Sequence, residues 1–257
     1  MQKNSTTRFS NRVENYVRYR PGYPDAVVRI LQTEAGLTPG AVIADIGSGT
    51  GISSALFLKH GFAVIGVEPN REMREAAESL LAGQPDFRSV NGTAEATTLA
   101  DRSVDFVVAG QAFHWFDVPK TRAEFARILK PGGKVALMWN TRRVDTTPFL
   151  RAYEDLLLKF ATDYQQVDHR NIDERVLKKF FANGEFTLRK VENEQVFDFA
   201  GLRGRLLSSS YAPADGEPGH APMLAELERI FQVHAKDSRV RFEYDTELYW
   251  GGVGADD

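Results

Sequence analysis

The sequence predicts an α/β protein built on a largely parallel sheet, and two observations support this. Residues 41–139 alternate short apolar segments, typical of buried strands, with longer segments that have the apolar spacing of helices. Beyond residue 140 this alternation stops, and a helical region is followed by an alternating strand, a helix and a long alternating strand. That order favours an antiparallel addition at one edge of the sheet.

The parallel part is expected to contain strands at residues 41–46, 62–68, 86–92, 103–111 and 133–140. Helices are expected at residues 50–61, 69–83 and 118–130. Gly61 and Gly83 stand where these helices should end, and Pro69 stands near a helix start. The run Pro131-Gly132-Gly133 should close the helix before the fifth strand.

The C-terminal part has a different pattern. Residues 147–182 read mostly as helix, and residues 222–236 form a further helical segment. Residues 186–199 and 239–251 alternate apolar and polar side chains, as strands do. The stretch 208–222 is rich in Ser, Pro and Gly, so we expect a loop there, and loops often carry binding residues.

Composition limits the class of protein. The 257 residues, 42% of them hydrophobic, suffice for a large globular domain. A net charge of −3 does not indicate nucleic acid as a partner. The absence of cysteine excludes disulfides, thiolate nucleophiles and zinc–cysteine sites. The polar first residues do not form a secretory signal, and no apolar run is long enough to cross a bilayer. We therefore expect a cytoplasmic protein with no membrane partner.

The strongest local signal is the segment Asp45-Ile46-Gly47-Ser48-Gly49-Thr50-Gly51, between the first strand and its helix. Its glycines let the backbone turn sharply and approach a ligand closely. Glu68 ends the next strand and should lie at the same sheet edge, where open parallel sheets bind ligands. A carboxylate at that place can accept hydrogen bonds from both hydroxyls of a ribose.

Three interpretations of this segment compete. A dinucleotide site requires G-x-G-x-x-G, whereas the spacing here is G-x-G-x-G. Asp45, two residues before the first glycine, would repel a pyrophosphate but suits the sulfonium and amino groups of S-adenosylmethionine. The residues therefore favour S-adenosylmethionine over NAD. The third interpretation is a tight strand–helix turn that binds nothing, and the well-placed Glu68 argues against it.

Four segments together resemble the class I S-adenosylmethionine-dependent methyltransferases: VIADIGSGTG, VIGVEP, SVDFVVAGQAFHWFD and ILKPGGKVAL. They occur in that superfamily's order over about residues 40–140. FSNRVENYVRYRPGYP and GQAFHWFD further resemble the branch that includes trans-aconitate methyltransferase. The resemblance implies a doubly wound, Rossmann-like sheet of seven strands with an antiparallel edge strand and a helical lid or insertion.

The same resemblance implies an organisation of the chain. Residues 1–39 would form an N-terminal lid, residues 40–140 the cofactor-binding core, and residues 141–257 a helical cover with C-terminal antiparallel strands completing the same domain. The residues that it implies for the cofactor are Asp45, Gly47, Ser48, Gly49, Gly51, Glu68, Pro69, Met73, Thr93, Ala94, Glu95, Gln111 and Trp115.

The acceptor side is less clearly marked. The residues we expect there lie in the expected lid, beside strand ends or in the loop-rich stretch, and they are Tyr16, Arg20, Tyr23, His114, Phe116, Arg142 and Tyr211. Arg20 or Arg142 could bind an anionic acceptor. His114 could act as a general base, although it could equally line the pocket, and methylation of a carboxylate needs no base. The other histidines show no metal-ligand spacing, so no metal is assigned.

The predicted activity is transfer of a methyl group from S-adenosylmethionine to a small molecule, specifically a carboxylic acid, leaving S-adenosylhomocysteine. Alternatives that the sequence leaves open are a methyltransferase acting on protein or RNA and a non-catalytic S-adenosylmethionine-binding protein. An NAD-dependent oxidoreductase is disfavoured by the glycine spacing and by Asp45.

Overall fold

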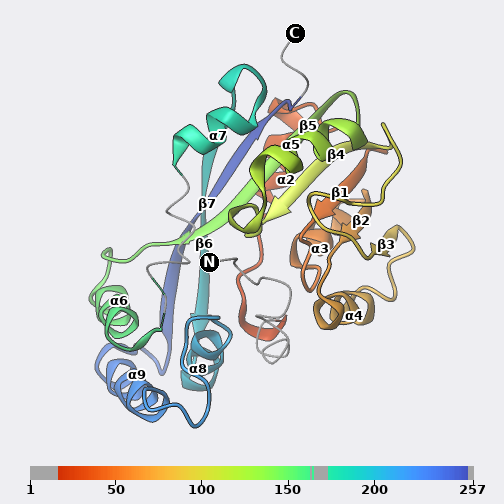
Figure 1. Cartoon of the computed structure of the whole chain (residues 1–257). Coiled ribbons are helices and arrows are strands. Elements are labelled where there is room, and N and C mark those ends of the chain that lie inside the picture. Colours follow the sequence, from red (N-terminus) through yellow and green to blue (C-terminus); the bar gives the residue numbers. More distant parts are fainter. Residues whose placement is uncertain (1–16, 163, 165–172, 254–257) are drawn as a thin grey trace.

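The computed structural model describes residues 17–162, 164 and 173–253 (Figure 1). In this part of the chain seven strands form one sheet in the order β3-β2-β1-β4-β5-β7-β6. The strands are β1 Val42–Ile46, β2 Ala63–Val67, β3 Phe87–Val90, β4 Val104–Gly110, β5 Leu129–Arg142, β6 Thr187–Phe197 and β7 Val240–Gly251. Strands β1 to β5 pair in parallel, and β7 runs antiparallel to both β5 and β6. The predicted mixed seven-stranded sheet is confirmed.

Alternating side chains of the central strands enter two apolar clusters, one on each face of the sheet. In β4, Phe106 and Val108 join the cluster covered by α2 (Ala26–Glu34) and α3 (Ile52–Lys59). Val107 and Ala109 point the other way, toward α5 (Val118–Ile128) and α7 (Glu174–Phe180). Because successive strand residues face opposite sides, an uninterrupted apolar strand is covered on both faces. The doubly wound arrangement is therefore confirmed.

Side-chain caps fix the starts of two helices near the sheet edge. Asn70 accepts a hydrogen bond from the backbone N–H of Met73 at 2.9 Å and begins α4 (Arg71–Leu80). Asp117 does the same for Lys120 at the start of α5. Such caps satisfy backbone donors that have no partner inside the helix. They hold the ends of both helices beside the carboxyl ends of the parallel strands.

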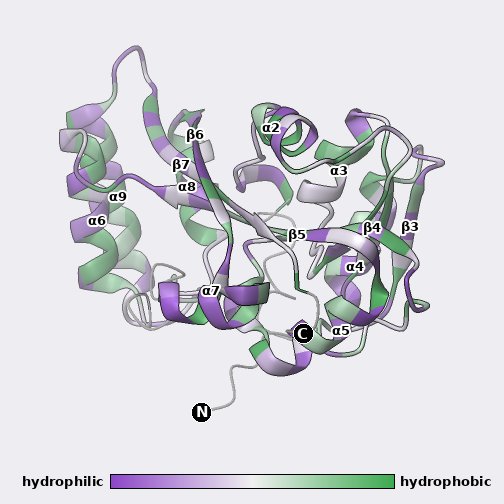
Figure 2. Ribbon diagram, turned by 90° about the horizontal axis from the view of Figure 1, so that it is seen from above, coloured by the Kyte–Doolittle hydropathy of each residue, from purple (hydrophilic) through white to green (hydrophobic). Residues whose placement is uncertain are grey.

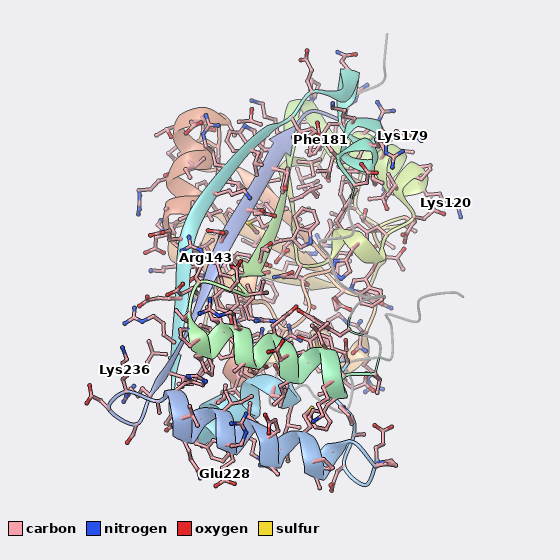
Figure 3. The ribbon with its side chains drawn as sticks, turned by 90° about the vertical axis from the view of Figure 1, so that its left-hand side faces the viewer. Lys120, Arg143, Lys179, Phe181, Glu228 and Lys236 are labelled. Atoms are coloured by element: carbon pink, nitrogen blue, oxygen red, sulfur yellow. The ribbon has the colours of Figure 1, made fainter. Side chains whose placement is uncertain are left out.

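The C-terminal strands are long and carry a second group of helices. These are α6 (Pro148–Phe160), α8 (Phe199–Leu207) and α9 (His220–His234), which share a third apolar cluster with β6 and β7. Figure 2 shows β5 to β7 running between this group and the helices around β1 to β4. In Figure 3, α6 and α9 lie one above the other across the ends of the long strands.

Two details differ from the sequence prediction. The helix expected at 118–130 ends at Ile128, and β5 begins at Leu129, four residues before the predicted strand. The early part of β5 pairs with β4 through an irregular register between Val104 and Phe106, which lets Pro131 and the following glycines lie inside the strand. Helix α8 was not expected, because its sequence FAGLRGRLL contains two glycines, which are poor helix formers.

Candidate active site

The glycine-rich loop after β1 is fastened to the end of β2. Backbone N–H groups of Gly47 and Ser48 both donate to the carbonyl oxygen of Val67, at 2.9 and 3.2 Å. Gly47, Gly49 and Gly51 have φ values of 68°, 55° and 85°, a region that favours glycine. The loop therefore turns sharply at the carboxyl edge of the sheet and leads directly into α3.

The glycines in this loop do different things. A Cβ on Gly47 would lie 2.7 Å from the Cβ of Ala112, so this position allows the loop to approach the segment after β4. A Cβ on Gly51 would instead lie 2.8 Å from Leu81 Cδ1, behind the loop. Gly51, predicted to line the cofactor site, serves the packing of α3 against the α4 end and lines neither recess described below.

Glu68 follows β2 and lies beneath the loop. Its Oε2 accepts a hydrogen bond from the N–H of Gly49 at 2.9 Å, and its Oε1 accepts one from the N–H of Asn70 at 2.8 Å. Burial raises the pKa of the Glu68 carboxyl, against the effect of these two hydrogen bonds. The side chain is 8% exposed, and each oxygen keeps a lone pair for a further donor.

Asp45 is completely buried at the end of β1. Both Ser53 and Ser54 donate from their hydroxyls to its Oδ2, at 2.7 and 2.6 Å. Its Oδ1 has no hydrogen-bond partner among the described residues. Burial raises the pKa of this carboxyl to about 6. Asp45 itself lines neither recess described below and lies buried beneath the glycine loop.

The raised pKa of Asp45 gives a testable pH dependence of stability. The pKa of about 6 exceeds the value of 3.8 in an unfolded chain, so the folded protein holds this proton more tightly. The stabilisation is complete below about pH 4 and is lost as the pH rises through about 6, a change of about 3 kcal/mol. Urea unfolding at several pH values should show this fall in the native protein and not in Asp45→Asn; parallel curves for the two proteins would contradict it.

A recess lies over the carboxyl ends of β2, β3 and β4. Ten of the predicted cofactor residues line it: Gly47, Gly49, Glu68, Pro69, Met73, Thr93, Ala94, Glu95, Gln111 and Trp115. Phe116, predicted for the acceptor, also lines this recess. We call it the cofactor recess because Glu68, the loop and the predicted adenine-side residues meet there.

Gln111 stands at the centre of the site with an unusual backbone conformation. Its φ is 57°, in the left-handed region that a residue with a side chain rarely adopts. Its backbone N–H donates to the carbonyl oxygen of Met138 at 2.8 Å, and its side-chain amide donates to the carbonyl oxygen of Asn140 at 3.2 Å. Strain of this kind persists where surrounding contacts hold it, and it concentrates at functional sites.

A second recess opens beside the first and shares with it Gly47, Gly49, Gly110, Gln111 and Trp115. Five of the predicted acceptor residues line this acceptor recess: Arg20, Tyr23, His114, Arg142 and Tyr211. Ser48, predicted for the cofactor, lines it too. Tyr16 lies outside the described residues. The structure therefore brings most of the predicted residues of both groups to two adjoining spaces.

Arg142 is buried and its charge is balanced. Its guanidinium forms an ion pair with Glu154 of α6 and a hydrogen bond with the Tyr164 hydroxyl at 3.1 Å. It lies over the Tyr153 ring, 5.0 Å from the ring centre. Its Nη1 has no hydrogen-bond partner among the described residues. One face of the group is thus fixed by the protein, and one nitrogen is left for a ligand.

His114 lies in the short 3-10 helix Phe113–Trp115, directly after β4. Its ring is tilted against that of Trp115, with ring centres 5.0 Å apart. Both side chains line the acceptor recess, and Trp115 lines the cofactor recess as well. This position at the junction is compatible with either role considered for His114, proton transfer or shaping of the pocket.

The N-terminal residues 19–23 form a strap across the long strands. Asn140 and Asn193 both donate to the carbonyl oxygen of Gly22, at 3.1 and 2.8 Å. Gln195 donates to the carbonyl oxygen of Tyr19 at 3.2 Å. Amide side chains of β5 and β6 thus hold the strap backbone in place, with Arg20 and Tyr23 at the wall of the acceptor recess.

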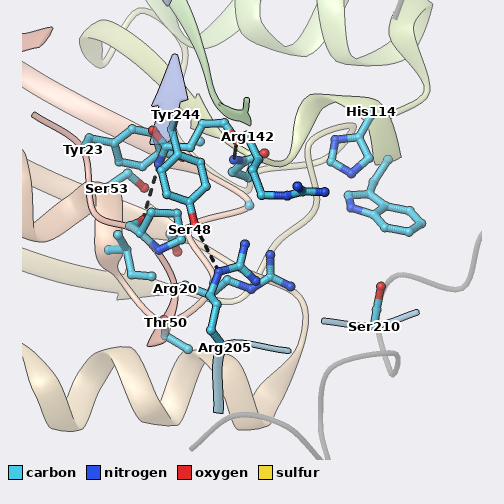
Figure 4. Close-up of a pocket in the computed structure, with 18 of the residues that line it drawn as sticks. Arg20, Tyr23, Ser48, Thr50, Ser53, His114, Arg142, Arg205, Ser210 and Tyr244 are labelled. Atoms are coloured by element: carbon cyan, nitrogen blue, oxygen red, sulfur yellow. Dashed lines mark hydrogen bonds between the residues drawn. The ribbon is translucent and has the colours of Figure 1, made fainter. Parts of the chain in front are cut away.

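Sequence reasoning missed several residues of the acceptor recess. Arg205, Ser210 and Tyr244 line it (Figure 4). Asn140 and Tyr164 line it as well. Tyr244 belongs to β7, where buried and less buried residues alternate regularly. The alternation in the sequence therefore predicts that Tyr244 points inward, but it does not predict the pocket that this side chain borders. Arg205 belongs to the unexpected helix α8, and a charged residue in such a segment normally faces solvent.

In the part of the chain that the structure describes, no group of three or more His, Cys, Asp or Glu side chains is placed to hold a metal ion. None of the helices described there has the length and apolar character to cross a bilayer.

The sheet order, the glycine loop after β1 and the acidic residue after β2 define the class I methyltransferase fold. Residues 44–137 match the family model described as a methyltransferase domain.

Curated relatives of this chain are also named as methyltransferases. An uncharacterized methyltransferase from Mycobacterium tuberculosis is 36% identical over 141 residues, which are 55% of this chain and 55% of the relative. A Schizosaccharomyces pombe uncharacterized methyltransferase-like protein is 32% identical over 156 residues, 60% of this chain and 59% of the relative. The chain thus aligns with little more than half the length of these relatives.

Solved structures support the fold over almost the whole chain. A proposed type II methyltransferase from Anaeromyxobacter dehalogenans is 23% identical, with a TM-score of 0.66, 92% of this chain and 99% of that chain being covered. Phosphoethanolamine N-methyltransferase 2 of Haemonchus contortus, in complex with S-adenosyl-L-methionine, is 16% identical with a TM-score of 0.55, covering 98% of this chain and 59% of that chain.

Proposed function

We propose that this protein transfers a methyl group from S-adenosylmethionine to a small anionic acceptor, specifically a carboxylic acid. The observation that carries the proposal is the meeting of two recesses at Gln111 and Trp115. One recess has the chemistry of an adenosine site, and the other is lined by Arg20, Arg142 and Arg205. The narrower resemblance to the trans-aconitate branch stays a prediction.

The residues present fit S-adenosylmethionine in three respects. The Glu68 carboxylate, already held by two backbone N–H groups, can accept the ribose hydroxyls. Asp45 places a buried negative charge with an unsatisfied oxygen under the loop, which favours a ligand bearing a sulfonium and an amino group over a pyrophosphate. Thr50, just before the N-cap of α3, lines the acceptor recess and has a buried hydroxyl without a hydrogen-bond partner among the described residues, so it can donate to the methionine carboxylate.

When bound, S-adenosylmethionine supplies an electrophilic methyl group on a positively charged sulfur. The protein contributes position: Gln111 and Trp115 border both recesses, so an acceptor in one meets the reacting group of the other there. Holding two reactants in line can supply about 7–11 kcal/mol of the barrier in favourable cases. The rings of His114 and Trp115 lie at this junction, where they can limit the access of water to a bound methyl group. A carboxylate acceptor is already ionised and needs no base.

The proposal is tested by calorimetric titration of the purified protein with S-adenosylmethionine, S-adenosylhomocysteine and NAD. We expect saturable binding of the two adenosyl ligands and none of NAD, followed by methyl transfer in a screen that begins with small carboxylic acids. Binding of NAD alone would overturn the proposal. Binding of both adenosyl ligands without any methyl transfer to a small molecule would leave a cofactor-binding protein and refute the acceptor class.

For His114→Ala we expect turnover of the acceptor to fall by about tenfold or more because the acceptor is positioned less well, with the affinity for S-adenosylmethionine changed less than about twofold. The reason is its place after β4 at the wall of the acceptor recess. Arg20→Ala should also impair the reaction more than it impairs cofactor binding, but it should do so by raising KM for the acceptor rather than by lowering kcat. Steady-state kinetics and calorimetry on the same preparations give both numbers. Equal losses of binding and turnover would place these side chains at the cofactor instead.

A further inference from the structure

Arg205 is a buried cation of the acceptor recess. It lies on α8, is 7% exposed, and its guanidinium reaches the recess in Figure 4. Its hydrogen-bond acceptors are uncharged hydroxyls at long distances: Nε lies 3.4 Å from the Tyr244 hydroxyl, and Nη1 lies 3.2 Å from the Ser209 hydroxyl. Within the described residues no carboxylate lies at ion-pair distance from it, in contrast to Arg142, which Glu154 neutralises.

This arrangement is unfavourable without a ligand. A guanidinium does not lose its proton at accessible pH, so burial cannot be relieved by neutralisation. Taking an ion out of water costs several kcal/mol unless an opposite charge and good hydrogen bonds compensate. Two distant hydroxyls do not supply that. Arg205 therefore has the character of a group kept charged for a bound anion, at the expense of stability.

The neighbours of Arg205 place this anion on the acceptor side. Tyr244, which contacts Arg205, stands directly opposite Arg142 in the pairing of β7 with β5, so both flank the same wall. Arg205 lines the acceptor recess and not the cofactor recess. Arg20 donates to the carbonyl oxygen of Ser208 at 2.9 Å and so adds a second guanidinium beside the end of α8.

We propose that Arg205 is the specificity-determining residue of the acceptor recess and binds a carboxylate or phosphate group carried by the acceptor. The inference rests on the proposed function and deepens it. Arg142, already neutralised by Glu154, orients the acceptor, whereas Arg205 supplies the charge that selects it. The same carboxylate chemistry could come from the methionine part of the cofactor, and the test separates these two sources.

The test measures thermal stability of the native protein saturated with S-adenosylhomocysteine, which occupies the cofactor carboxylate position. Sodium phosphate and sodium acetate are titrated against sodium chloride at equal ionic strength. We expect at least one of the two anions to raise Tm beyond the chloride effect, and Arg205→Met to abolish that rise. If only phosphate or only acetate raises Tm, that anion identifies whether the acceptor carries a phosphate or a carboxylate group. No rise in the native protein, or a rise that S-adenosylhomocysteine removes, would overturn the proposal.

A second readout separates selection from a structural role. Because the methionine side chain fills similar space without charge, Arg205→Met should be as stable as the native protein or more stable when no ligand is present. Its apparent affinity for the effective anion should fall at least about tenfold, and Arg205→Lys should recover part of it. Arg143→Met is the matched control, since Arg143 is paired with Asp245 and Glu192 outside both recesses.

The outcomes for the two proposals differ. If Arg205→Met has a lower Tm than the native protein but its Tm still rises with the anion, Arg205 is a structural residue and the inference is refuted. Weaker S-adenosylhomocysteine binding by Arg205→Met would assign the guanidinium to the cofactor and also refute it. Failure of the native protein to bind S-adenosylhomocysteine would refute the proposed function instead, and the anion titration is then read without that ligand.

Discussion

Replacing Glu68 with alanine is expected to reduce the affinity for S-adenosylmethionine by at least about 100-fold. The carboxylate is buried beside the glycine loop, and its two oxygens face the cofactor recess while accepting from Gly49 and Asn70. Removing it would delete the two charge-assisted hydrogen bonds that we propose it accepts from the ribose, and would leave these two backbone donors unsatisfied. Calorimetric titration of native and variant proteins measures the change directly.

The control for this experiment is Glu75→Gln. Glu75 lies on α4 near the site but forms an exposed ion pair with Arg71, so its loss should leave binding unchanged. A thermal melt of each variant separates loss of the site from loss of the fold. If Glu68→Ala binds S-adenosylmethionine as the native protein does, the ribose is held elsewhere and the assignment of the cofactor recess is wrong.

The second large effect is expected for Gly47→Ala. The added Cβ would lie 2.7 Å from Ala112 Cβ and 3.4 Å from Phe116 Cζ, in a backbone with φ of 68°. Overpacking of this kind costs about 1–3 kcal/mol, and the left-handed backbone about 1–2 kcal/mol more. Relief requires the loop to move away from the segment after β4, which changes the floor shared by both recesses. We expect a lower Tm and at least about tenfold weaker S-adenosylmethionine binding.

Gly40→Ala isolates the two causes. Gly40 has a φ of 83° and nothing within 4 Å of the added Cβ, so this variant carries the backbone strain without the collision. Its Tm should fall by a smaller amount, and its affinity for S-adenosylmethionine should stay native. If both variants lose the same stability and neither loses binding, the close approach at Gly47 does not shape the site.

The parallel half of the molecule could be predicted because its signals are local. A strand buried on both faces is continuously apolar, and the turn after β1 requires glycines at fixed positions. Glu68 then follows from the chain order alone, since parallel strands end at one edge. Each of these inferences uses residues close together in the sequence.

The acceptor side could be predicted only in part. Arg142 and His114 follow strand ends and were found, but the ion pair that neutralises Arg142 depends on α6 folding back over β5. Arg205 reaches the recess because α8 packs against β6 and α9, and the glycine loop that it meets there lies far away in the sequence. No periodicity in the sequence predicts that such segments meet in space. The sequence also does not distinguish a buried arginine from an exposed one.

The helices α6, α8 and α9 have an apolar cluster of their own, separate from the clusters around β1 to β4. This separation affects how proteins with this fold can diverge in sequence. Helices α6, α8 and α9 pack against the far parts of β6 and β7 rather than on β1 to β4. Changes that repack this group alter the walls around Arg205 and Tyr211 and leave Glu68 and the glycine loop untouched, because distant sites vary independently. If the proposed function holds, a lineage built on this plan can exchange one acceptor for another and keep the same cofactor site.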